Sequence, residues 1–425
     1  MVLGILILVL IILLLTGMPI AFVLLTIGSA GIITLQGFDT LQGILATTAY
    51  RSVNSFVYSA IPLFVLMAHF ISKSKIADEL FDSVIKWVGH VPGGAGIATV
   101  LASAGFGTLS GSSVAATAAM SQIAIPQMMK ANYSDSFSAG LVATSTGVLA
   151  AMIPPSVPLI LYGIQTENSI GKLLVAGILP GLLIAFLLCL FIVVISFKNK
   201  SKTPRAAWKE RFVSLKNIWP MVILVIFVLY VIYSGTGTAT EAAAFGAFGA
   251  LVIGLVMKRL NFQLIFEALM HTTKQTTMIF TIIIGAHVFS YYIAMTRIGN
   301  TMVTAIEDSG FPTWGILLLI IILYLIMGMF MDLIGTMLLT IPLVYPLIVG
   351  LGYDPIWFGI VLVLLLEIGL VTPPVGINLF ITSEQSGIST GKVLGGAVPF
   401  IGVLLVALLV IILFPQIALY LPSLM

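Results

Sequence analysis

Residues 93–126, GGAGIATVLASAGFGTLSGSSVAATAAMSQIAIP, are apolar, break at a run of small and hydroxyl residues from Ser110 to Ser113, and become apolar again. This pattern predicts a helical hairpin with its tip at the break. Residues 138–163, SAGLVATSTGVLAAMIPPSVPLILYG, form one apolar span that Pro154 and Pro155 interrupt, because proline removes a backbone donor and restricts the preceding residue. Backbone groups left unpaired in a bilayer must be satisfied by protein, water or an ion. We therefore expect both breaks to line one polar cavity.

The same arrangement recurs in the second half of the chain. Its landmarks are the pairs Pro126 and Pro342, Pro154 and Pro373, Gly171 and Gly391, and Lys75 and Arg297, at offsets of 216, 219, 220 and 222 residues. A slowly drifting offset predicts two structural repeats. Interrupted apolar segments at matching places in two repeats indicate the binding site of a transporter.

Composition indicates a polytopic membrane protein. Hydrophobic residues make up 60% of the 425 residues and charged residues only 8%, with a mean hydropathy of +1.20, which is far above what a soluble domain requires. The chain is apolar from Val2 with no basic region before it, so we expect a retained first span and not a cleaved signal. A single cysteine, Cys189, excludes an internal disulfide.

Apolar runs of bilayer length divide the chain into two all-α repeats. We expect repeat 1 over residues 1–197, a basic cytoplasmic linker or lateral helix over 198–216, and repeat 2 over 217–425. The expected segments of repeat 1 are scaffold spans within 1–72, a hairpin at 93–126, a broken span at 137–166 and a span at 173–197. Those of repeat 2 are scaffold spans within 218–257, a span at 276–295, a hairpin at 313–350, a broken span at 356–382 and a span at 396–420. Each repeat would have five crossings, and since five is odd, the second repeat is expected to be inverted.

Lysine and arginine predict the orientation. With the N-terminus outside, all 18 lysines and arginines except Arg51, Lys172 and Arg297 fall on the cytoplasmic side. We therefore predict that both termini are periplasmic, with the first hairpin entering from the cytoplasm and the second from the periplasm. The basic segment 198–216 is expected to rest on anionic lipid headgroups. Topology explains its charge, so nucleic acid binding has little support.

Six motifs resemble the large membrane subunit of the TRAP transporters, the tripartite ATP-independent periplasmic family. They are IPLF from Ile61, GHVPGGAG from Gly89, SGSSVAATAAM from Ser110, IPPS from Ile153, TEAAA from Thr240 and TPPVGINLF from Thr372. The resemblance implies a sodium-coupled importer of organic anions in the bacterial inner membrane, with an elevator-type moving domain. It also implies two partners, a small four-helix membrane subunit and a periplasmic substrate-binding protein.

The tip of the first hairpin offers oxygen atoms to an ion or a substrate. Hydroxyl groups lie there, and the half-helix that follows presents its positive end to an anion; alternatively, the small residues serve only close helix packing. Hard cations such as Na⁺ take oxygen ligands. The expected Na⁺ ligands of this half are Ser110, Gly111, Ser113, Ile153 and Pro154, and the expected substrate contacts are Ser110, Ser112 and Ser156.

The tip of the second hairpin, residues 328–336, carries a carboxylate where the first carries hydroxyl groups. An acid at midplane depth is costly unless it is paired, so we expect Asp332 to bind a cation, couple a proton or contact the substrate. The Na⁺ ligands expected in this half are Gly328, Asp332, Gly335, Thr336, Val371 and Thr372, which would make at least two Na⁺ sites in all. Asn378 lies just beyond the facing break, and Glu367 is a further polar candidate.

Arg297 is one of the basic residues expected outside, and it ends an apolar span after Tyr291 and Tyr292. Its guanidinium group could hold a substrate carboxylate by two parallel hydrogen bonds. The alternative role is an anchor at the membrane interface beside aromatic residues.

The motifs favour a carrier that is not an enzyme. An intramembrane hydrolase is the weaker alternative, because there is no G-x-S-x-G motif and Asp332 follows Met331 and not a glycine. An ion channel is the other alternative function, although two opposed hairpins suit two gates better than one pore. No phosphate-binding G-x-x-x-x-G-K-[ST] motif occurs. Among the carboxylates that the resemblance permits, the many hydroxyl groups at both breaks favour sialic acid, and a C4-dicarboxylate is the other candidate.

Overall fold

The computed structural model describes residues 2–74, 76–196, 205–298, 301–302, 304 and 312–425. These residues form helices joined by short turns, and the described ranges contain no strand. The predicted all-α membrane fold is therefore confirmed. By length and hydropathy, seven helices among the described residues could cross a membrane, or up to nine if each bent pair counts as one span.

The helices of the first half are α1 (Val2–Leu15), α2 (Ile20–Gln36), α3 (Phe38–Val53), η1 (Phe56–Ser59), α4 (Ala60–Lys73), α5 (Ile76–Val88), α6 (Gly94–Ser110), α7 (Ser113–Lys130), α8 (Asp135–Met152), α9 (Val157–Gln165), α10 (Ile170–Ala176) and α11 (Ile178–Ser196). Those of the second half are α12 (Trp208–Tyr233), α13 (Ala239–Val256), α14 (Phe262–Thr296), α16 (Thr313–Phe330), α17 (Leu333–Gly350), α18 (Pro355–Gly369), α19 (Ile377–Ser386), α20 (Thr390–Leu413), α21 (Gln416–Leu419) and η2 (Pro422–Leu424).

Two helical hairpins and two interrupted helices have capped ends at their breaks. Helix α6 ends at Gly111, whose φ of +57° suits a residue without a side chain, and the Ser112 hydroxyl then caps α7. In the second hairpin, Asp332 caps α17 in the corresponding place. The first broken span consists of α8 and α9, which are bent by 45°. The second consists of α18 and α19.

The helices that begin the two broken spans lie at the centre of the molecule. All residues of α8 from Ser138 to Met152 are buried, as are those of α18 from Trp357 to Gly369. Burial on every side is expected of helices that are apolar all round. Helix α8 packs against α6, α7 and α20, and α18 packs against α16 and α17.

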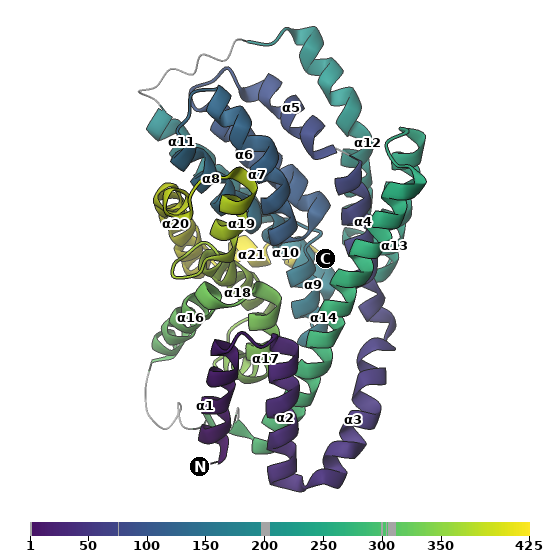
Figure 1. Ribbon diagram of the computed structural model, residues 1–425, viewed down its shortest axis with the longest axis vertical. Coiled ribbons are helices and arrows are strands. Elements are labelled where there is room, and N and C mark those ends of the chain that lie inside the picture. The colour runs from purple at the N-terminus through teal and green to yellow at the C-terminus, as the bar shows by residue number, and fades with distance from the viewer. Residues whose placement is uncertain (1, 75, 197–204, 299–300, 303, 305–311) are drawn as a thin grey trace.

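A second group of helices flanks this central group. Figure 1 shows the long helix α14 beside α2 and α4, with α13 against α4 and α12 against α13 and α5. Helices α1 to α3 extend to one end of the molecule, and α5 and the start of α12 lie at the other. This flanking group contacts the hairpins, with α4 and α5 against α6 and α14 against α17.

Several bounds differ from the sequence-based expectation. Two helices, α3 and α5, were not predicted, because α3 has little hydropathy and α5 has polar residues along one face. The span expected at 276–295 is the C-terminal part of α14, which begins earlier and is 35 residues long. Of the linker expected over 198–216, residues 198–204 lie outside the described residues. The part from Trp208 is helical and meets the following span at an angle of 49°.

Candidate functional site

The tip of the first hairpin contacts the break of the first broken span directly. The carbonyl oxygen of Gly111 accepts a hydrogen bond of 3.2 Å from the amide of Val157. A Cβ atom added to Gly111 would lie 2.8 Å from the carbonyl oxygen of Pro155. One turn earlier, a Cβ atom on Gly107 would lie 2.7 Å from the Cα atom of Ala150. Glycine is therefore required on the hairpin, because the two backbones touch.

The second repeat builds a corresponding contact. The amide of Gly376 donates a hydrogen bond of 3.3 Å to the carbonyl oxygen of Met329. A Cβ atom on Gly369 would lie 2.5 Å from the Cα atom of Gly328. Gly328 and Gly369 follow Gly107 and Ala150 by 221 and 219 residues. Each hairpin tip thus meets the break of the span in its own half.

The three serines predicted to contact substrate have different surroundings. The Ser110 hydroxyl is buried and donates to the carbonyl oxygen of Ser112 at 3.3 Å. Ser112 is half-buried, and its hydroxyl accepts a hydrogen bond of 3.5 Å from the amide of Ala115. The fully buried Ser156 donates to the carbonyl oxygen of Ala151 and caps α9. Its hydroxyl therefore serves its own span, and Ser112 is the more accessible of the three.

Asp332 is half-buried at the edge of a cavity of about 1060 Å³. One carboxylate oxygen, Oδ2, accepts a hydrogen bond of 3.0 Å from the amide of Gly335. The other cavity walls are the turn between α1 and α2 and the residues Met278 and Thr281 of α14. Ile20 at the start of α2 touches the hairpin, since a Cβ atom on Gly335 would lie 2.1 Å from its Cδ1 atom. The carboxylate thus faces a space between the flanking and central groups of helices.

A buried polar cluster joins the two repeats behind these tips. The Ser113 hydroxyl, at the start of α7, donates to Oε2 of Glu367 in α18 at 2.9 Å. The side-chain amide of Asn378 in α19 donates to the same hydroxyl at 3.0 Å. All three side chains are buried, and a Cβ atom on Gly147 of α8 would lie within 2.4 to 2.9 Å of the three polar groups. Four helices from both halves therefore meet at this point.

Main-chain oxygen atoms at both breaks fit the predicted Na⁺ ligands. Within the described residues, no hydrogen bond is formed to the carbonyl oxygen of Ile153, Pro154 or Val371. Such oxygen atoms suit a hard cation. The Thr372 hydroxyl donates to Ile368 at 2.6 Å, and the buried Thr336 hydroxyl donates to the main chain of Asp332 at 2.8 Å. Each of these two hydroxyl oxygens keeps lone pairs for a cation.

Carboxylate, imidazole and thiolate groups do not gather at the breaks in the described part of the chain. Among the described residues, no group of three or more His, Cys, Asp or Glu could hold a metal ion. A cation at the breaks would therefore be bound mainly by carbonyl and hydroxyl oxygen atoms.

The structure does not bring Arg297 to these residues. It is exposed at the end of α14, where it has a φ of +53°. Gly31 of α2 contacts Tyr292 of α14, and Gly31 lies about 16 Å along α2 from Ile20, which contacts the second hairpin. Arg297 lies five residues beyond Tyr292 and therefore still farther from the tip of that hairpin. Its position fits the alternative role at a membrane interface better than contact with the substrate.

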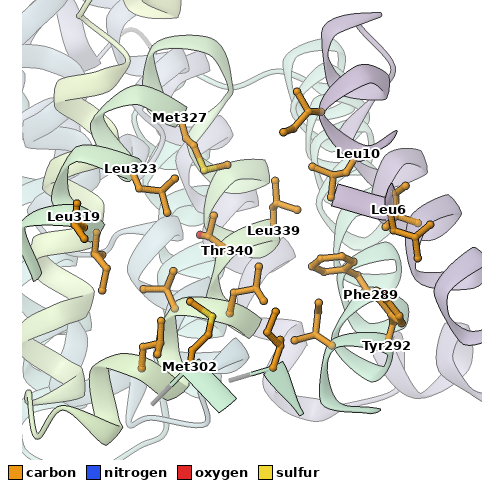
Figure 2. A pocket seen from close by; sticks show the side chains of 18 of the residues that line it. Leu6, Leu10, Phe289, Tyr292, Met302, Leu319, Leu323, Met327, Leu339 and Thr340 are labelled. Atoms are coloured by element: carbon orange, nitrogen blue, oxygen red, sulfur yellow. The ribbon is translucent and has the colours of Figure 1, made fainter. Parts of the chain in front are cut away.

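A second cavity, of about 850 Å³, lies on the side of the second hairpin nearer Arg297. Figure 2 shows Leu6 and Leu10 of α1 and Phe289 and Tyr292 of α14 on one side, and Leu319 and Leu323 of α16 on the other. The polar side chain of Thr340 lies between the two sides. The cavity is almost entirely apolar, and the polar side chains that line it are Thr340 and Tyr292.

Sequence reasoning missed two parts of this site. The turn at Gly17, Met18 and Pro19 lines the cavity beside Asp332, and its glycine and proline were the available signal. The second is a polar contact between α7 and α19, in which the Ser121 hydroxyl donates to that of Thr382 at 3.4 Å. Its signal was the spacing of four residues between Asn378 and Thr382, which places both on one helix face.

Comparison with known proteins gives a family match over nearly the whole chain. The family model described as tripartite ATP-independent periplasmic transporter, DctM component, matches residues 7–417. The C4-dicarboxylate TRAP transporter large permease protein DctM of Pseudomonas aeruginosa is 36% identical over 403 residues, covering 94% of each chain. The sialic acid TRAP transporter large permease protein SiaM of Vibrio cholerae is 32% identical over 97% of this chain and 96% of its own. The ectoine TRAP transporter large permease protein TeaC of Halomonas elongata is 33% identical over 97% of each.

A solved structure shares the fold. The YdaH transporter of Alcanivorax borkumensis matches with a TM-score of 0.66 over 96% of this chain and 97% of its own, at 12% sequence identity. At that identity the likeness concerns the fold alone.

Proposed function

Since this chain belongs to the family of the TRAP transporter DctM component, the large permease proteins, we propose that it imports a small organic carboxylate by sodium-coupled secondary active transport. It is a multi-pass membrane protein of a family of transporters and not of enzymes. The proposed location is the bacterial inner membrane, with both termini in the periplasm. The proposed partners are a small four-helix membrane subunit and a periplasmic substrate-binding protein. One relative, the isethionate TRAP transporter permease protein DctMQ, is longer than this chain, which covers 64% of it.

The contact between hairpin tips and breaks is the observation that carries this proposal. Gly111 touches the first break and Gly328 touches the second, and unpaired carbonyl oxygens lie at both. Two Na⁺ ions bound there would connect each tip to its break. Sodium binding would then fix the tips in the arrangement that the substrate requires.

The proposed movement is of the elevator type. The central helices would move as one body against the flanking group, carrying both hairpins. The apolar cavity in Figure 2 and the cavity beside Asp332 both lie between α1, α2 and α14 on one side and α16 and α17 on the other. Loose packing along this boundary supports the proposal, because a sliding interface needs few interlocking side chains.

The proposed substrate contacts are Asp332 and Ser112, with the positive ends of α7 and α17 available to a carboxylate. The Asp332 carboxylate accepts hydrogen bonds only, so a substrate that reaches it must also carry hydroxyl or amide donors. Sialic acid has this combination, and a C4-dicarboxylate is the second candidate. The relatives named for different substrates include both.

Uptake into proteoliposomes tests the proposal. Liposomes holding this chain and its small partner are given labelled sialic acid or succinate, with and without an inward Na⁺ gradient and the binding protein. The expected result is accumulation of one acid that requires both. Equilibration without accumulation under a verified gradient would instead support a channel, and no movement of any carboxylate by folded protein would contradict the proposal.

A further inference from the structure

Glu367 is a buried acid with no cationic side chain beside it. Its side chain is 1% exposed at the end of the central helix α18. The ion pairs among the described residues are Lys73 with Glu267, Arg259 with Glu79, and Lys392 with Asp135. None of them includes Glu367, although a buried carboxylate in a membrane protein requires a partner.

The hydrogen bonds of the cluster leave acceptors unpaired. Asn378 uses an N–H group on the Ser113 hydroxyl, and Ser113 uses its only hydrogen on Oε2 of Glu367. Oε1 of Glu367 and Oδ1 of Asn378 then have no hydrogen-bond partner among the described residues, and both are buried. Two acceptors cannot bond to each other, so the missing partner carries positive charge or a hydrogen.

A third unpaired oxygen belongs to the same contact between α7 and α19. The Thr117 hydroxyl is fully buried and has no hydrogen-bond partner in the part of the chain that the structure describes. Thr117 lies one helical turn from Ser113 and one from Ser121. Both of these serines bond to side chains of α19, Asn378 and Thr382 respectively. Thr117 therefore faces α19 between them.

We infer that Oε1 of Glu367, Oδ1 of Asn378 and Oγ1 of Thr117 bind a Na⁺ ion at the junction of the two repeats, separate from the two sites at the tips and breaks. Carboxylate, amide and hydroxyl oxygens are ligands of a hard cation. One carboxylate balances one positive charge, so a divalent ion would leave buried excess charge.

A metal ion accounts for more of the cluster than a proton does. A proton on Glu367 could supply one hydrogen bond and would leave at least one of the three oxygens unpaired. A cation that binds between α7, α18 and α19 would pair all three. The inference rests on the proposed function only in taking Na⁺ as the ion, because the unpaired oxygens need a partner whatever substrate is carried.

Sodium binding to the purified full-length chain tests this inference without any transport. Radiolabelled Na⁺ is counted per chain, and thermal stability is followed as NaCl replaces choline chloride. We expect Glu367→Gln to bind one Na⁺ fewer than the wild type. Thr117→Val keeps its shape but loses one ligand, and we expect it to weaken that Na⁺ about tenfold. Glu384→Gln, which changes an exposed carboxylate of α19, is the matched control and should bind as the wild type does.

Two results would overturn the inference. One is an unchanged Na⁺ count in folded Glu367→Gln, or an unchanged Na⁺ affinity in Thr117→Val should the first variant not fold. The other is an infrared carboxylic-acid band in the Na⁺-saturated wild type that Glu367→Gln lacks, which would place a proton there. If Glu367→Gln binds one Na⁺ fewer but the wild-type chain never accumulates a carboxylate, the proposed function is contradicted and the Na⁺ site is supported.

Discussion

The amide of Val157 donates a hydrogen bond to the carbonyl oxygen of Gly111, so the tip of the first hairpin is bonded to the half-helix beyond the first break. A hairpin entering a membrane leaves backbone groups without partners at its tip, and so does a broken span at its break. Here the Gly111–Val157 hydrogen bond pairs one backbone group of the tip with one backbone group of the broken span. A change at the tip is therefore expected to disturb the break as well.

Gly111→Ala tests this relationship. The added methyl would need a φ of +57°, which costs an alanine about 1–2 kcal/mol, and it would lie 2.8 Å from the carbonyl oxygen of Pro155. We expect loss of Na⁺-driven uptake together with lower thermal stability. Gly352→Ala is the control, because Gly352 has a φ of +80° with nothing within 4 Å of the added atom. Equal uptake by the two variants would contradict a role for the tip contact.

Asp332→Asn separates the helix cap from the negative charge. Asparagine caps helices as well as aspartate does, so the stability of α17 should change by less than about 0.5 kcal/mol. Uptake should fall roughly tenfold or more if the carboxylate contacts Na⁺ or substrate. The control is Asp354→Asn, which changes the exposed cap of α18. Wild-type uptake by Asp332→Asn would show that this residue only caps its helix.

A cross-link between Ile20 and Gly335 tests the elevator movement. These residues touch across the boundary between the flanking helix α2 and the second hairpin. In a Cys189→Ser background, Ile20→Cys with Gly335→Cys should block uptake when oxidised and recover it when reduced, while Na⁺ binding persists. The single-cysteine variants control for the substitutions. Full uptake by the oxidised, cross-linked protein would exclude sliding at this boundary.

His90 provides a pH-dependent test outside the membrane spans. Loss of hydration and the guanidinium groups of Arg205 and Arg211 lower the pKa of His90 from its ordinary value. Because the folded chain favours the neutral ring, stability is fully present above pH 6.5 and falls as pH drops through the lowered pKa. His90 Nδ1 lies 3.4 Å from Nη2 of Arg211, so Arg211→Gln should raise this pKa. Titration of the ring by NMR measures it, and an unchanged pKa would contradict the assignment.

Local sequence signals predicted the elements of the fold. Glycines and serines placed the tip at Gly111, and Pro154 and Pro373 placed the two breaks, because these residues act on the backbone within a few positions. The proximity of Ser113 to Glu367 spans 254 residues. No local pattern encodes such a contact, although the presence of an acid deep in an apolar span did single out Glu367.

Site assignments from residue type alone were less secure than the fold. Ser156 has the hydroxyl that a binding residue needs, but its position just before α9 makes it a cap and turns the hydroxyl to the main chain. Arg297 has the charge that a carboxylate needs, but α14 continues past the tip of the second hairpin and ends beside the apolar cavity, away from Asp332. In both cases the local backbone or the length of a helix determined where the side chain lies.

The length of α14 sets a condition on the surrounding lipid. Its 35 residues span about 52 Å, whereas the hydrocarbon layer of a bilayer is about 30 Å thick. Tilts of up to about 40° cannot hide this difference, so about a turn or more at one or both ends must stand in the headgroup layer or in water. The turn with Glu267, which is paired with Lys73 at 2.7 Å, is suited to that position. A helix longer than the bilayer tolerates changes in membrane thickness, so the frame around the moving helices should keep its shape in thin and thick lipid alike.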